Sequence, residues 1–222
     1  MRIDFRFSYQ MGKGLRTTLH ALMLAALMSF GTSAYSASKT ILVLGDSLSA
    51  EYGLVRGEGW VTLLQKKMET EKIAAPIVNA SISGETTSGG KARLPALLAK
   101  HQPAVVIIEL GANDALRGLS LTATQQNLRS MIRSAKDVKA KVLLVGMQIP
   151  PNYGGDYTKQ FAALFPTLAK ENKIALVPFM LQGVAEKPEL FQADRIHPSA
   201  AAHPRILNNI WPQLKPLIIT LK

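Results

Sequence analysis

From Lys39 onward, the sequence alternates short apolar runs with longer segments in which apolar residues recur every three or four positions. Five of the runs have the length of β-strands, at residues 40–44, 76–79, 104–110, 141–146 and 174–178. Several are apolar along most of their length, which is typical of strands in a parallel sheet whose two faces are both covered. The alternation predicts an α/β fold, because each helix returns the chain to the same end of a parallel sheet.

Five further segments have the spacing of a helix with one buried face. Their apolar residues are Trp60, Leu63, Leu64 and Met68; Leu94, Leu97 and Leu98; Leu128, Met131, Ile132 and Ala135; Phe161, Leu164, Phe165 and Leu168; and Ile206, Ile210 and Leu214. Thr122 and Gln125 have the spacing of a capping box, and we expect Pro212 to interrupt the last helix. With right-handed crossovers, the pattern predicts a flavodoxin-like three-layer α/β/α sandwich with a five-stranded parallel sheet.

The N-terminal segment has a different pattern. A basic lead with four Lys or Arg residues precedes an apolar run at residues 21–30, and small residues follow the run. The run is too short to cross a bilayer, so this order predicts a secretory signal peptide over residues 1–37, with a membrane anchor as the alternative. We therefore expect a single mature domain at residues 38–222, located in the periplasm or secreted.

The composition excludes several kinds of site. The chain has no cysteine, which rules out disulfides, a thiolate nucleophile and cysteine-ligated metal centres. Without residues 1–34 it has 22 basic and 14 acidic residues, a net charge of +8 against +11 for the whole chain. The basic residues are dispersed and form no nucleic-acid-binding motif, so we expect no nucleic-acid partner and at most a weak contact with anionic membrane surfaces. We expect a monomer.

Polar residues follow the first three predicted strands of the sheet. Ser47 lies in a Gly-Asp-Ser-Leu-Ser sequence directly after the first strand, where a helix cap would be the alternative to a nucleophile. Gly84 lies in the polar segment after the second strand, and Asn113 follows the third. A glycine lets a backbone N–H approach a ligand, and an amide can donate to an oxyanion, although both residues are also common in turns. Ligands bind at the carboxyl ends of strands in such sheets.

A fourth polar segment precedes the last helix. Asp194 lies three residues before His197, close enough to fold back within one turn and hold the imidazole. A surface pair is the alternative. Of the other histidines after residue 37, His101 is predicted to be solvated at a helix end, and His203 to be a surface or packing residue.

The combination and order of these segments resemble the SGNH, or GDSL, family of hydrolases over about residues 40–213. Residues 45–49 match the first block, Gly84 the second-block glycine, Asn113 the third-block asparagine, and Asp194 with His197 the last-block acid and base. Within the family, residues 79–86, 111–118 and 149–154 are most similar to the exported bacterial multifunctional esterase, thioesterase and lysophospholipase group. Ala112, Ala115 and Ser199 depart from the residues that are common in the family. No Gly-x-Ser-x-Gly elbow is present, so an ordinary α/β-hydrolase is not indicated.

The resemblance implies a serine esterase that acts on acyl, aryl or thioester substrates and on lysophospholipids. Ser47 would be the nucleophile, His197 the base and Asp194 the acid that orients it, and the oxyanion would be bound by the backbone N–H groups of Ser47 and Gly84 and the side chain of Asn113. No metal or cofactor is expected. Asp46, next to the nucleophile, is interpreted as support for the turn, and Glu51, Glu109 and Asp114 are interpreted as structural.

Two alternatives remain at this point. A carbohydrate acetyl esterase of the same family would use the same residues with a more polar pocket. A secreted binding module would keep the fold and lose turnover. The apolar, proline-rich segment at residues 147–153 favours acyl chains.

Overall fold

The computed structural model describes residues 39–219, so the predicted signal peptide lies outside the described residues. Five parallel strands form one sheet in the order β2-β1-β3-β4-β5. The strands are β1 (Ile41–Gly45), β2 (Ile77–Asn79), β3 (Val105–Glu109), β4 (Lys141–Val145) and β5 (Ala175–Val177). The predicted five-stranded parallel sheet is therefore confirmed, and the strand order is that of the flavodoxin-like folds.

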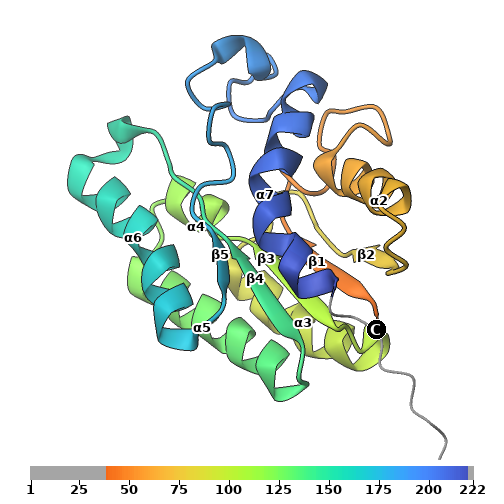
Figure 1. The fold of residues 1–222 in the computed structure, drawn as a ribbon. Helices are drawn as coiled ribbons and strands as arrows, with labels where there is room; N and C mark the ends of the chain where they lie inside the picture. The colour runs from red at the N-terminus through yellow and green to blue at the C-terminus, as the bar shows by residue number, and fades with distance from the viewer. Residues whose placement is uncertain (1–38, 220–222) are drawn as a thin grey trace, which may run out of the picture. The chain divides into compact units, whose positions relative to one another are not determined.

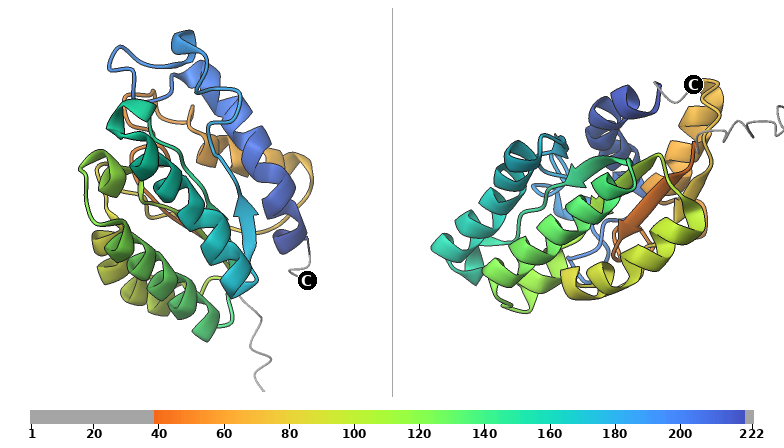
Figure 2. Two further views of the ribbon diagram at one scale, coloured as in Figure 1. Left: turned by 90° about the vertical axis from the view of Figure 1, so that its left-hand side faces the viewer. Right: turned by 90° about the horizontal axis from the view of Figure 1, so that it is seen from below.

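Helices cover both faces of the sheet (Figures 1 and 2). The helices α2 (Trp60–Thr70) and α7 (His203–Ile218) contact each other on one face, and α3 (Thr87–His101), α5 (Leu121–Asp137) and α6 (Gly155–Asn172) form a row on the other. The short helix α4 (Ala112–Leu116) lies directly after β3. Three short 3₁₀ helices, at Pro151–Tyr153, Pro188–Leu190 and Ala200–Ala202, lie in the remaining connections.

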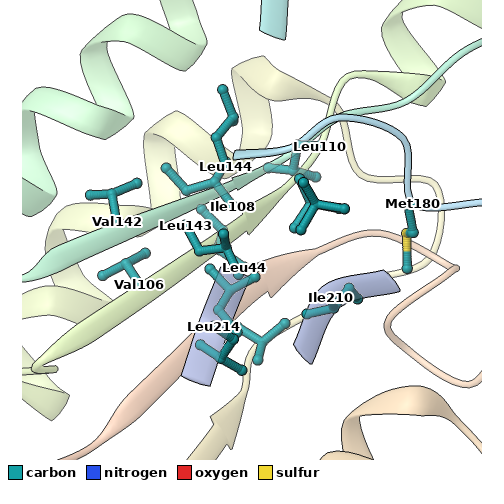
Figure 3. Packing of buried hydrophobic residues seen from close by; sticks show 14 of the residues in the cluster. Leu44, Val106, Ile108, Leu110, Val142, Leu143, Leu144, Met180, Ile210 and Leu214 are labelled. Carbon is teal, nitrogen blue, oxygen red and sulfur yellow. The ribbon is translucent and has the colours of Figure 1, made fainter. Parts of the chain in front are cut away.

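The core lies on both faces of the central strands. Residues 41–44 of β1 and 105–108 of β3 have no exposed surface. Figure 3 shows side chains of β1, β3 and β4 packed together with Ile210 and Leu214 of α7. Because each fully buried side chain of this kind contributes about 1.5–3 kcal/mol, the central strands are a rigid base for the loops at their ends.

Two details of the predicted helices were wrong. The helix α5 is capped by Ser120, whose hydroxyl accepts from the Ala123 N–H at 3.3 Å, so Thr122 lies inside the first turn and forms no capping box. The helix α7 continues through Pro212 and Pro216. A proline inside a helix costs about 3 kcal/mol, but α7 buries a long apolar stripe against the sheet, and this burial keeps the helix continuous.

Among residues 39–219, none of the helices combines the length and apolarity required for a transmembrane span.

Candidate active site

The strand order reverses between β1 and β3, because the chain leaves these neighbouring strands in opposite directions. Such a switch point is the usual ligand site of an open parallel sheet. The register pairs Gly45 with Glu109 at the carboxyl ends of the two strands. The Ser47 turn and the Asn113 helix therefore start beside each other.

The turn after β1 places Ser47 at its tip. The Asp46 carbonyl accepts from the N–H groups of Ser49 and Ala50, and the Asp46 carboxylate accepts from the Leu48 N–H at 3.0 Å. Gly45 permits the turn, because a Cβ at this position would lie only 2.8 Å from the Glu109 carboxylate and the Ser49 side chain. The turn leaves Ser47 half-buried while its neighbours on both sides are buried.

Ser47, His197 and Asp194 form one chain of hydrogen bonds. The Ser47 Oγ lies 3.0 Å from His197 Nε2, and His197 Nδ1 lies 2.7 Å from Asp194 Oδ2. The other Asp194 oxygen accepts from the backbone N–H groups of Ile196 and His197. These backbone hydrogen bonds, with the bond to the His197 ring, lower the pKa of Asp194 to about 2. The carboxylate is thus charged at neutral pH and can stabilise a protonated imidazole.

The segment that carries His197 is fixed to the Ser47 loop by Gln192 and Tyr52, which no sequence pattern indicated. Gln192 donates from its backbone N–H to the His197 carbonyl and from its side chain to the carbonyls of Tyr52 and Pro198. The Tyr52 ring lies against the imidazole, with 4.3 Å between the ring centroids. Tyr52 and Gln192 are 140 residues apart in the chain, so no local pattern could have indicated their contact.

The proposed oxyanion donors come from three strand ends. Gly84 has a φ of +77°, a conformation that favours glycine. Its loop is held on one side by the Ile82 N–H, which donates to the Gly45 carbonyl, and on the other by the Arg117 guanidinium, which donates to the Gly84 carbonyl at 3.0 Å. Within residues 39–219, the N–H groups of Ser47 and Gly84 donate to no protein acceptor, so both are available to a ligand.

Asn113 lies in α4, and its side-chain amide donates to the second oxygen of Asp46 at 3.0 Å. The interpretation of Asp46 as turn support alone was therefore incomplete. Arg117, one helical turn after Asn113, was also missed, although a spacing of four residues within a helix places two side chains on one face.

Two buried carboxyl groups lie beneath Ser47. Glu109 accepts from the Ser49 hydroxyl at 2.7 Å and from the Asp46 N–H at 3.3 Å, and Ser49 accepts in turn from the Trp60 indole at 3.2 Å. Burial raises the pKa of Asp46 to about 6 and raises the pKa of Glu109 well above its usual range. Glu109 accordingly holds a proton more readily than an exposed glutamate would.

The remaining acids and histidines serve the fold. Asp114 accepts from the Thr87 N–H and hydroxyl and so joins α4 to the start of α3, and Glu51 accepts from the Gly57 and Gly59 N–H groups and from Thr62. His203 is buried, and its Nδ1 accepts from the Trp60 N–H at 3.0 Å at the start of α2. This contact agrees with the expected packing role.

His101 is half-buried in the last turn of α3.

In the part of the chain that the structure describes, no group of three or more His, Asp or Glu side chains is placed to hold a metal ion.

This arrangement can perform acyl transfer. It offers a hydroxyl beside a base, an ionised acid behind that base, and the backbone N–H groups of Ser47 and Gly84, to which the described residues supply no acceptor. Those are the groups that nucleophilic attack on a carbonyl requires.

Comparison with known proteins gave consistent matches. The model of the GDSL-like lipase/acylhydrolase family matches residues 43–205. Esterase TesA of Pseudomonas aeruginosa is 54% identical over 183 residues, covering 82% of this chain and 91% of the relative. Thioesterase 1/protease 1/lysophospholipase L1 of Escherichia coli K12 is 44% identical, covering 82% and 86% of the two chains. An arylesterase of Vibrio mimicus is 42% identical over 193 residues, covering 86% of this chain and 96% of the relative.

Solved structures agree with these matches. The crystal structure of TesA superimposes with a TM-score of 0.79 at 54% identity, covering 80% of this chain and 99% of TesA. The psychrotrophic esterase EstA from Pseudoalteromonas, inhibited by monoethylphosphonate, superimposes with a TM-score of 0.78 at 41% identity and covers 82% of this chain and all of EstA.

Proposed function

The chain belongs to the GDSL-like lipase/acylhydrolase family, and on this premise we propose that it hydrolyses carboxylic esters and thioesters through a covalent acyl-serine intermediate on Ser47. The observation that carries the proposal is the hydrogen-bonded chain from Ser47 through His197 to Asp194. The relatives at 42–54% identity are an esterase, a thioesterase/lysophospholipase and an arylesterase, which supports this substrate class.

The first half of the reaction forms the acyl-enzyme. His197 Nε2 takes the Ser47 hydroxyl proton as Ser47 Oγ attacks the carbonyl carbon, and the carbonyl π electrons move to the oxygen. The Ser47 and Gly84 N–H groups and the Asn113 amide stabilise the oxyanion. As the tetrahedral intermediate collapses, His197 gives its proton to the leaving alcohol or thiol.

The second half releases the acid. His197 removes a proton from water, and the resulting hydroxide attacks the acyl carbonyl. The intermediate collapses, and the proton on His197 returns to Ser47 Oγ. Asp194 stays ionised throughout and stabilises the imidazolium each time it forms.

Two segments that follow strands β3 and β4 at the carboxyl edge of the sheet are proposed as walls for the acyl chain. One follows Asn113, at residues 114–120, and the other is residues 147–153. Met147 and Ile149 are buried, whereas Leu119 and Tyr153 expose about two-fifths of their surface. The Tyr157 hydroxyl donates to the Leu119 carbonyl at 2.9 Å and so fixes the first segment to α6. An apolar wall on this side supports acyl chains over acetylated sugars.

The test is a series of p-nitrophenyl esters and matched thioesters of increasing acyl length. Each methylene buried in the pocket contributes about 0.8 kcal/mol, so kcat/KM should rise about fourfold per methylene until the pocket is full. A decline from acetyl upward, with acetylated sugars as the best substrates, would support the carbohydrate esterase instead. The Ser47→Ala variant is the control for background hydrolysis.

We also propose that residues 1–37 direct export and are removed. The basic lead, the short apolar run and the small residues support this proposal. N-terminal sequencing of protein from the periplasm or medium should find a start near Ser38, or near Tyr35 if cleavage follows Ala34. An intact N-terminus on cytoplasmic protein would contradict the proposal.

A further inference from the structure

The two oxygens of the Asp46 carboxylate accept hydrogen bonds from two different residues. Its Oδ1 accepts from the Leu48 N–H at 3.0 Å, which supports the turn that presents Ser47. Its Oδ2 accepts from the Asn113 Nδ2 at 3.0 Å. Support of the turn needs only the first oxygen, so the second oxygen has a separate function.

The hydrogen bond to Oδ2 determines how the Asn113 amide faces. The amide is planar, with an acceptor oxygen on one side and two N–H donors on the other. A flipped amide would bring its oxygen against the Asp46 carboxylate, which is repulsive. One N–H is therefore held by Asp46, and the second N–H of the same nitrogen is left for another acceptor.

Asp46 is itself held rigidly. Its residue exposes only 1% of its surface, and its backbone N–H donates to Glu109, which also binds Ser49. Burial excludes water that could compete for the amide. A carboxylate held in this way fixes its partner much more firmly than a solvated one would.

We propose that Asp46 is a positioning residue that holds the Asn113 amide with one N–H directed at the oxyanion. This inference rests on the proposed function, since it assigns Asp46 to the oxyanion site of that reaction. The pKa of Asp46, about 6, leaves the carboxylate mostly ionised at pH 7.5, where it can accept both hydrogen bonds.

Two substitutions separate the two functions of Asp46. Asp46→Ser offers one hydroxyl oxygen that can accept from the Leu48 N–H, as serine does in turns, but it leaves Asn113 without a partner. Asp46→Asn has one acceptor oxygen and one donor group, so it satisfies Leu48 and presents N–H groups to Asn113. We expect the Asn113 amide then to flip and turn its N–H groups away from the oxyanion.

Both variants should lower kcat by about 10-fold to 10²-fold with KM changed less than about twofold, because the oxyanion exists only in the transition state. In an Asn113→Ala background, either substitution should cost less than about twofold more. Circular dichroism and thermal unfolding check that each variant is folded. If Asp46→Asn does not fold, Asp46→Ser still tests the inference.

Glu51→Gln is the matched control. Glu51 also binds backbone N–H groups in the loop after β1, but it has no contact with Asn113. Its effect should fall mainly on stability, and any effect on kcat should multiply with that of Asn113→Ala.

Wild-type kcat in both folded Asp46 variants, or losses that multiply with that of Asn113→Ala, would overturn the inference. Failure of the proposed function would look different: the wild type would lack esterase activity, or Ser47→Ala would retain it.

Discussion

The two sides of Ser47 are built in opposite ways. On the acid–base side, Asp194 and His197 come from one four-residue segment, and their side chains are 37% and 19% exposed. On the proposed oxyanion side, Asp46 and Glu109 lie at the ends of two neighbouring strands and are almost fully buried, and Asn113 lies in the helix that follows the second of these strands. One side is local and open to solvent, and the other is assembled by the sheet.

The two sides also differ in the pKa values of their aspartates. Backbone N–H groups lower the pKa of Asp194 to about 2, whereas burial raises the pKa of Asp46 to about 6. By linkage, ionised Asp194 stabilises the fold above pH 3.8, and this contribution is lost as the pH falls toward 2. For Asp46 the sign is reversed, because its ionisation between pH 3.8 and 6 lowers stability. Ionised Asp46 on the proposed oxyanion side therefore lowers stability, whereas ionised Asp194 does not.

The largest expected effect is on the acid–base side. Ser47→Ala and His197→Ala should each lower kcat by about 10⁴-fold or more, and the double variant should be little worse, because the two residues act as one unit. Steady-state ester hydrolysis measures this, with circular dichroism as the check on folding. Full activity in a folded Ser47→Ala protein would refute the proposed nucleophile.

A smaller effect is expected on the oxyanion side. Asn113→Ala should lower kcat by about 10²-fold to 10³-fold and change KM much less, since its amide is proposed to bind charge that develops in the transition state. The separate kcat and KM values from a substrate titration decide this. A raised KM with an unchanged kcat would make Asn113 a binding or turn residue instead.

His203 belongs to neither the acid–base group nor the proposed oxyanion group, so its replacement should affect stability and not turnover. His203→Ala should leave kcat within about threefold but lower the free energy of unfolding by about 1–3 kcal/mol, because the buried Trp60 N–H loses its acceptor. Urea unfolding at pH 7.5 measures the loss. A variant of unchanged stability would show that solvent replaces this hydrogen bond without cost.

The smallest expected effect is a pH dependence of stability that comes from His203. Burial lowers the pKa of His203, although Glu51 opposes the shift. A histidine with a lowered pKa stabilises the fold above pH 6.5, and this contribution is lost as the pH falls through its folded-state pKa. Wild type should therefore lose stability on acidification below pH 6.5 that His203→Ala does not lose. Parallel slopes for the two proteins between pH 7.5 and 5 would contradict the assignment.

Local signals explain what the sequence predicted well. Apolar runs set the five strands, and helical spacing set the buried faces of the helices that cover them. The spacing of Asp194 and His197 predicted their contact, because three residues span about one turn of chain. The errors also have local causes, because Thr122 and Pro212 were interpreted from short-range rules. Ser120, and not Thr122, caps α5. Burial of the apolar stripe of α7 outweighed the tendency of Pro212 to break the helix.

The sequence by itself determined the α/β class, the parallel sheet and the polar segments that end its strands, because these depend on periodicity and turn chemistry within a few residues. Only the tertiary structure decided that Asp46 binds Asn113, 67 residues away, that Arg117 holds the Gly84 loop, and that His203 caps α2. The physical reason is that a side chain's second hydrogen-bond partner depends on strand register and burial. Both are properties of the assembled sheet, in which Gly45 and Glu109 end side by side.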